Sequence, residues 1–207
     1  MLRLLTLALA LALVSAPALA QPGDEDAEQA EYIRLSAEMK TLASKNAWEG
    51  VERTFQRLEH TGVPLKYQDY FLAAQAARAA GNIAAARDRL LKANDIKENR
   101  EVMDWLWELD SSYGKVSLQC DPGTLQLEPE SMPFHPDRAA AVRFAEKQVA
   151  DTGTFEGYLP EGNYTFGKFE VTVAPRVQTV RIDARGMEVG KKGKKGKEEP
   201  TTVAEAA

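Results

Sequence analysis

A change in hydrophobic period near residue 114 is the feature that most constrains this chain of 207 residues. From residue 24 to about residue 113, apolar side chains recur every three or four positions, which indicates amphipathic helices. From Lys115 onward they alternate with polar side chains, which indicates strands with one buried face. The sequence therefore predicts an α+β protein, in which N-terminal α-helical hairpins are followed by a small antiparallel β-sandwich-like domain with one short helix.

The first part contains five expected helices. One stripe of the first helix carries the apolar residues Tyr32, Leu35, Met39 and Leu42. The second helix follows a break near Asn46 and ends at His60–Pro64, where a glycine and a proline stop it. The remaining helices are expected at residues 66–80, 83–93 and 100–109. Because only a few residues separate these helices, neighbours must lie antiparallel.

The second part contains short strands separated by turn residues. Alternation on both sides of Asp121–Thr124 predicts a β-hairpin, and helical spacing over Asp137–Ala150 predicts the short helix. Further strands are expected at residues 154–159, 164–166, 169–173 and 178–182. Pro160–Asn163, "PEGN", is expected to form the turn of a hairpin, because proline presets one backbone angle and Gly162 tolerates positive φ.

The segment Tyr70–Asp95, "YFLAAQAARAAGNIAAARDRLLKAND", has small residues around a glycine–asparagine turn. It resembles a tetratricopeptide (TPR) repeat, a pair of helices joined by a short turn. The residues that carry the resemblance are Tyr70, Ala74, Gly81, Asn82, Ala86 and Ala93. A preceding unit over residues 32–58 can be aligned with it, although Glu38 then stands where Ala74 does.

The TPR resemblance implies a groove lined by the first helix of the better repeat. Its candidate partner-binding residues are Gln68, Phe71, Gln75 and Arg78. Within this set, Arg78 could pair with an acidic ligand or a C-terminal carboxylate. The alternative is that Phe71 belongs to the core and Arg78 is an ordinary solvated charge.

The stretch "LPEGNY" at residues 159–164, followed by "FEVTV" and "QTVRI", resembles the PEGA β domain, which is named after its proline, glutamate, glycine and alanine signature. The resemblance extends over residues 115–183 and implies a β-sandwich exposed at a cell surface. The expected organisation is therefore a helical domain over residues 21–113 and a β-rich domain over residues 114–184.

The two ends of the chain carry different signals. Arg3 precedes an apolar run, Leu4–Val14, and the small residues of "SAPALA", which together predict a signal peptide over residues 1–20. The protein is thus expected to be exported, to the periplasm or to the cell surface and beyond, with no transmembrane anchor after signal removal. Residues 185–207 form a lysine-rich tail without apolar periodicity, which predicts disorder.

Residues suited to catalysis are few. The histidines are His60 and His135, the single cysteine is Cys120, and no metal, cofactor or phosphate-loop motif occurs. A Cys120–His135 pair could make a thiolate nucleophile, but Cys120 alternates in phase with Val116, which favours a buried, inert thiol. A formal net charge of −5 disfavours nucleic acid as a partner. We therefore expect no enzyme, no catalytic residue, no cofactor and no metal.

Together these features predict an exported, non-enzymatic interaction or scaffold protein that binds a protein partner through its helical repeats, its β domain or both. The alternative is a cell-envelope protein whose β domain binds glycan or another cell-wall polymer such as peptidoglycan. In that alternative the aromatic residues Tyr158, Tyr164 and Phe166 are candidates for stacking on sugar rings.

Overall fold

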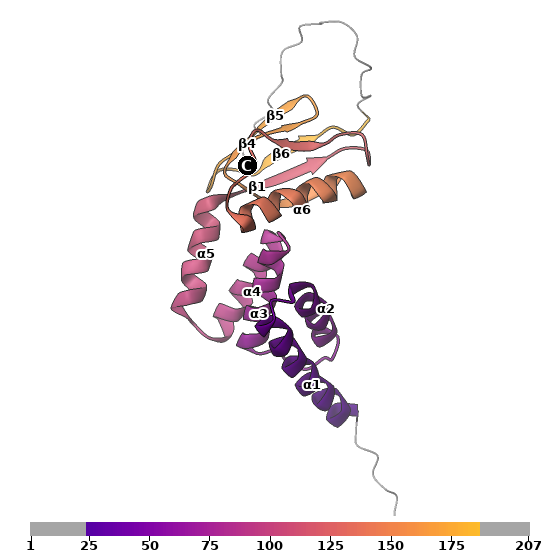
Figure 1. The fold of residues 1–207 in the computed structure, drawn as a ribbon, viewed down its shortest axis with the longest axis vertical. Coiled ribbons are helices and arrows are strands. Elements are labelled where there is room, and N and C mark those ends of the chain that lie inside the picture. Colours follow the sequence, from indigo (N-terminus) through magenta and orange to yellow (C-terminus); the bar gives the residue numbers. More distant parts are fainter. Residues whose placement is uncertain (1–23, 187–207) are drawn as a thin grey trace, which may run out of the picture.

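The computed structural model describes residues 24–186 and shows an α+β fold with the helices first (Figure 1). The predicted signal peptide and all of the predicted tail except Arg185 and Gly186 lie outside these residues. The helices are α1 (Asp24–Ser44), α2 (Trp48–Glu59), α3 (Tyr67–Ala79), α4 (Ile83–Ile96), α5 (Arg100–Ser112) and α6 (Pro136–Thr152). The strands are β1 (Tyr113–Gln119), β2 (Leu127–Pro129), β3 (Thr154–Pro160), β4 (Gly162–Phe166), β5 (Phe169–Val173) and β6 (Val180–Asp183).

The five N-terminal helices confirm the predicted helical hairpins, because each helix packs on the next and α1 also reaches α3. Tyr32, Leu35 and Met39 of the α1 stripe are buried as their spacing predicted, and Leu42 is partly buried. A buried carboxylate also joins α1 to α3. Asp69, which is 1% exposed, accepts hydrogen bonds from the Tyr32 hydroxyl at 2.7 Å and the Ser36 hydroxyl at 2.9 Å. Every donor to this buried carboxylate helps to meet its desolvation cost.

The helical and β parts dock directly on each other through α6, which lies between the sheets and the α3–α4 hairpin (Figure 1). Gly81, in the turn between α3 and α4, has φ +83° and comes so close to α6 that an added Cβ would lie 2.2 Å from the Ala140 carbonyl oxygen. Only glycine combines this backbone angle with this approach. The shared core includes Phe71 of α3, Leu109 of α5, Tyr113 of β1 and Ala141 of α6.

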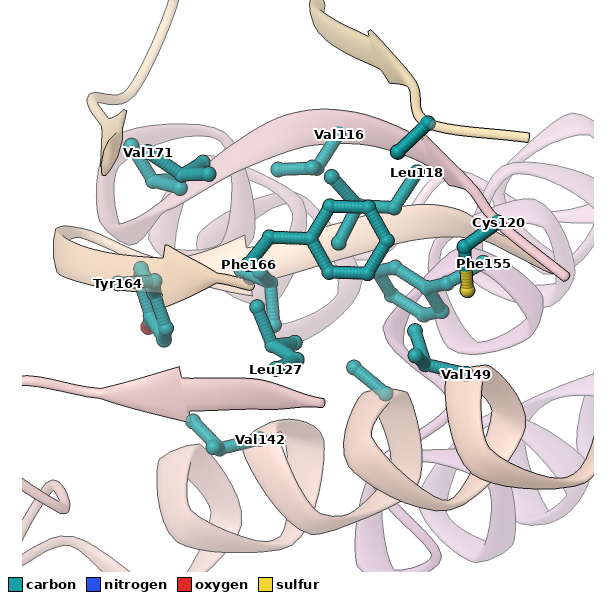
Figure 2. Close-up of a cluster of buried hydrophobic side chains, with 14 residues drawn as sticks. Val116, Leu118, Cys120, Leu127, Val142, Val149, Phe155, Tyr164, Phe166 and Val171 are labelled. Atoms are coloured by element: carbon teal, nitrogen blue, oxygen red, sulfur yellow. The ribbon is translucent and has the colours of Figure 1, made fainter. Parts of the chain in front are cut away.

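The β part consists of two three-stranded sheets, in the orders β3-β1-β6 and β2-β4-β5. Side chains from both sheets and from α6 fill one interior, as Figure 2 shows for Leu118, Phe166 and Val149. This arrangement confirms the sandwich-like prediction. The pairing is antiparallel except between β1 and β6, which run parallel. The helix α6 has 17 residues, so it is longer than the short helix that was predicted.

Two predicted hairpins are wrong. β1 and β2 do not pair with each other across Asp121–Thr124, because β1 pairs with β3 and β6 while β2 pairs with β4 in the other sheet. Likewise, β3 and β4 flank Glu161 but belong to different sheets, so Pro160–Asn163 forms a corner between sheets. In both places the period of two was right, but alternation specifies which face is buried and leaves the pairing partner open.

Over residues 24–186, none of the helices combines the length and the apolar character that crossing a membrane requires.

Candidate partner-binding groove

A groove of about 480 Å³ opens on the inner side of the helical part, where α3 and α5 meet the start of α6. Its walls come from four helices and the segment before α6. The lining residues are Trp48, Gln75, Arg78, Ala79, Trp105, Glu108, His135 and Asp137. Gln75 and Arg78 belong to the set that the TPR resemblance implied. The surface of this groove is hereafter called the inner groove.

Arg78 lies on the floor of the inner groove and is held by two carboxylates. Its Nη1 and Nη2 donate to Glu108 at 3.1 Å and 2.9 Å, and its Nε donates to Asp137 at 2.8 Å. The guanidinium also lies 5.0 Å from the centre of the Trp105 ring. Burial opposes the charge, but the hydrogen bonds to Glu108 and Asp137 outweigh that effect and raise the pKa of Arg78.

These hydrogen bonds determine whether Arg78 is available to bind a ligand. Its side chain is 14% exposed, and three of its N–H groups are directed at protein carboxylates from α5 and α6. The sequence left a choice between a ligand carboxylate and a solvated charge, and the structure shows neither arrangement. Arg78 instead joins three helices, so its role in the groove is to position the walls.

The other three implied residues differ in their access to solvent. Phe71 is 8% exposed and lies in the core, with its ring 5.5 Å from the Trp105 ring and 5.8 Å from the Tyr67 ring. Gln68 is exposed at the start of α3, and Gln75 is partly exposed two turns later on the same helix. Gln68 and Gln75 are therefore the members of the set that a partner can reach.

Two lining residues of the inner groove, and two exposed apolar residues close to one of them in the chain, were missed as binding residues by sequence reasoning. Trp48 lines the groove from the first turn of α2, and His135 lines it from the segment before α6. Next to His135, Phe134 is fully exposed and Met132 is 42% exposed. A signal for Phe134 was present in the sequence, since an aromatic residue between prolines in "MPFHP" belongs to no periodic stretch.

The residues considered for catalysis are not brought together. Cys120 is 3% exposed and its backbone N–H bonds to the Gly153 carbonyl, just after the last turn of α6. His135 is the N-cap of the same helix, so about 25 Å of helix separates them at 1.5 Å per residue. Within residues 24–186 no group of three or more His, Cys, Asp or Glu side chains is placed to hold a metal ion.

The aromatic residues considered for sugar stacking are also divided by the fold. Tyr164 is 3% exposed and Phe166 is fully buried, and both belong to the sandwich core (Figure 2). Tyr158 is partly exposed, on the opposite side of α5 from the inner groove, in a second hollow.

No protein-family model matches the chain, and no curated protein or solved structure shows a significant similarity to it.

Proposed function

We propose that this chain is an exported, non-enzymatic interaction protein that binds a segment of a protein partner in the inner groove. The observation that carries the proposal is the combination of a groove walled by Trp48 and Gln75 with the fully exposed Phe134, the residue just before the lining residue His135. Aromatic side chains in and around a concave surface are typical centres of binding free energy in protein interfaces. An exposed phenylalanine costs free energy in water unless a partner covers it.

The charges of the inner groove restrict the charge of the partner segment that can bind there. Glu108 and Asp137 contribute two negative charges against the single positive charge of Arg78. A ligand carboxylate would be repelled by these two acids. The N–H donors of Arg78 that could bind it already donate to Glu108 and Asp137. The partner segment we propose is therefore neutral or basic, and it supplies an apolar side chain for Trp48 and a hydrogen-bonding group for Gln75.

The helical arrangement supports a TPR-like origin for the groove, which we also propose. The α1–α2 and α3–α4 hairpins stack so that α2 and α1 both contact α3, and Asn82 caps α4 by accepting from the Ala85 N–H at 3.1 Å. In this proposal α5 closes the stack, and the β part is a PEGA-like domain docked on its end.

A peptide-display selection on the chain from residue 21 to residue 207 tests this function. We expect the selection to enrich peptides that share an apolar anchor and carry no net negative charge. Binding of an enriched peptide, measured by calorimetry, should weaken about tenfold in both Trp48→Ala and Phe134→Ala.

Ile33→Ala is the matched control, because Ile33 is an exposed apolar residue of α1 that does not line the groove. It should leave the affinity unchanged, and circular dichroism should show that all three variants fold. If no peptide is enriched, or if the enriched peptides bind Trp48→Ala and Phe134→Ala as well as the unchanged chain, the proposal is wrong.

A further inference from the structure

A second hollow, of about 510 Å³, lies on the outer side of α5 where the helical and β parts meet. It is separate from the inner groove, and the two share no lining residue. Its walls come from α4, α5, β1, β3 and the connection before β6. The lining residues are Arg87, Trp107, Asp110, Tyr113, Lys115, Tyr158, Arg176, Val177 and Thr179. This surface is called the outer hollow below.

The outer hollow is positively charged although the chain as a whole is negative. Arg87, Lys115 and Arg176 face one carboxylate, Asp110, which leaves two positive charges in excess among the lining residues. Arg87 donates to Asp110 at 2.8 Å and 3.3 Å, so this pair is internally matched. Lys115 has only a 3.6 Å contact with the exposed Glu156, and Arg176 makes no ion pair with any residue between 24 and 186. Arg176 is therefore the unmatched positive charge, and together with the weakly paired Lys115 it attracts an anionic ligand.

The outer hollow also presents apolar ring surface to water. Trp107 is 66% exposed and has no stacking or cation–π partner among the residues that the structure describes. Val177 beside it is 61% exposed, and Tyr158 lines the same hollow from β3. An indole and a phenol on the walls of a charged hollow offer flat apolar surfaces to a ligand that also carries polar groups.

The size of the outer hollow favours a compact ligand over an extended peptide. Two strands reach the hollow, β1 at Tyr113 and Lys115 and β3 at Tyr158, and these stretches are paired with each other. The hollow is bounded on several sides, and its volume is within the range of pockets for small molecules or a few sugar rings.

We propose that the outer hollow binds an acidic saccharide, in which carboxylates are carried on sugar rings. Trp107 stacks on the apolar face of one ring, and Lys115 and Arg176 pair with its carboxylate. The Arg87–Asp110 pair keeps free donor and acceptor positions, which suit neighbouring hydroxyl groups of a sugar. This inference goes beyond the protein-binding function and does not depend on the inner groove.

Titration of the chain from residue 21 to residue 207 with tetragalacturonic acid tests the proposal by calorimetry and by tryptophan fluorescence, whose change should be lost in Trp107→Ala. We expect binding that weakens as salt is raised, because two ion pairs contribute. Trp107→Ala should weaken it about tenfold and Arg176→Asn about threefold. Asparagine is chosen because it tolerates the φ of +57° at residue 176.

Two matched variants lie on the same helix but outside the hollow. Met103→Ala removes an exposed apolar side chain of α5, and Arg100→Asn removes an exposed charge at its first residue. Both should bind tetragalacturonic acid like the unchanged chain. Cellotetraose, a neutral saccharide of equal length, should bind at least about tenfold more weakly.

Three results would overturn the proposal. The first is no binding of tetragalacturonic acid at concentrations up to about 10 mM, and the second is equal binding of cellotetraose. The third is tighter binding of hexaglutamate, which would make an acidic peptide the ligand. Loss of saccharide binding in Trp107→Ala with peptide binding intact separates this site from the inner groove.

Discussion

The two sides of α5 carry the same three chemical groups in different surroundings. On the inner side Trp105 and Glu108 meet Arg78 of α3, and on the outer side Trp107 and Asp110 meet Arg87 of α4. On α5 itself, Trp107 and Asp110 each follow their inner counterparts by two positions, which turns them about 200° around the helix. One helix therefore divides the inner groove from the outer hollow.

The difference between the two sides lies in what covers them. The inner side has α6, whose Asp137 adds a second carboxylate to Arg78, and Phe71, whose ring lies 5.5 Å from Trp105. Among residues 24–186 the outer side has no such layer, so Trp107 stays 66% exposed and Arg87 is 31% exposed against 14% for Arg78. The same triad thus stabilises the fold on one side of α5 and stays accessible to a ligand on the other.

The largest expected difference in stability between the two sides is for substitutions of the two arginines. Arg78→Met should lower the free energy of unfolding by about 3 kcal/mol, because it leaves Glu108 and Asp137 without their partner. Arg87→Met should cost about 0.5 kcal/mol, because its pair with Asp110 is more exposed. Denaturant unfolding monitored by circular dichroism measures both values.

Adding Glu108→Gln to Arg78→Met should restore part of the lost stability, because one of the two unpaired charges is removed. Equal costs for the two arginine variants would contradict the structural assignment of the inner triad.

Substitutions of the two tryptophans should show a smaller difference in stability, again with the larger loss on the inner side. Trp105→Ala removes a ring that packs on Phe71 and lies under Arg78, and we expect a loss of about 2 kcal/mol. Trp107→Ala removes a mostly exposed ring, and we expect a change below about 0.5 kcal/mol. Thermal unfolding of both variants checks the difference, and a larger cost for Trp107→Ala would reverse the roles of the two sides.

Two buried tyrosines of the β part, Tyr113 at the start of β1 and Tyr164 in β4, test hydrogen bonding next to the end of α5. The Tyr164 hydroxyl donates to the Pro160 carbonyl at 2.8 Å, so Tyr164→Phe should cost about 1 kcal/mol. The buried Tyr113 hydroxyl has no hydrogen-bond partner among residues 24–186, so Tyr113→Phe should be neutral or slightly stabilising. Denaturant midpoints at pH 7 measure both, and a cost for Tyr113→Phe equal to that of Tyr164→Phe would show a bond that the structure lacks.

The pH dependence of stability at alkaline pH gives a further test of the burial of Tyr113. Burial raises the pKa of Tyr113 to about 12, whereas an unfolded tyrosine titrates near pH 10. The unfolded state therefore loses this proton first, so the stability from neutral Tyr113 is complete below pH 10 and is lost as the pH rises from about 10 to about 12. Tyr113→Phe should make the decline of unfolding free energy with pH shallower in this window, and an unchanged slope would contradict the burial.

Much of the fold could be predicted from sequence because burial repeats with the period of each element. Leu35 and Met39 are buried in α1, and Val116 and Leu118 are buried in β1, as their spacings required. The partners of the strands could not be predicted this way. β1 alternates identically whether it pairs with β2, which follows it in the chain, or with β6, which lies more than 60 residues away.

For the candidate sites, too, the sequence predicted positions on single elements but not the contacts between elements. The TPR resemblance located Gln75 and Arg78 on α3, where both line the inner groove. It could not show that Asp137, 59 residues away, joins Arg78, because that contact depends on how α6 docks. Of the residues that line the outer hollow, only Tyr158 was a binding candidate from the sequence, since the lining residues come from five separate segments that carry no shared motif.

The amino-acid sequence is enough to predict the order of helices and strands, the faces that they bury and the scarcity of catalytic groups. Which of two similar triads on α5 is covered and which is open depends on how the elements pack in three dimensions. The physical reason is that periodicity reports how each residue lies on its own element, whereas burial of the inner triad requires α6 to pack on the α3–α4 turn at Gly81.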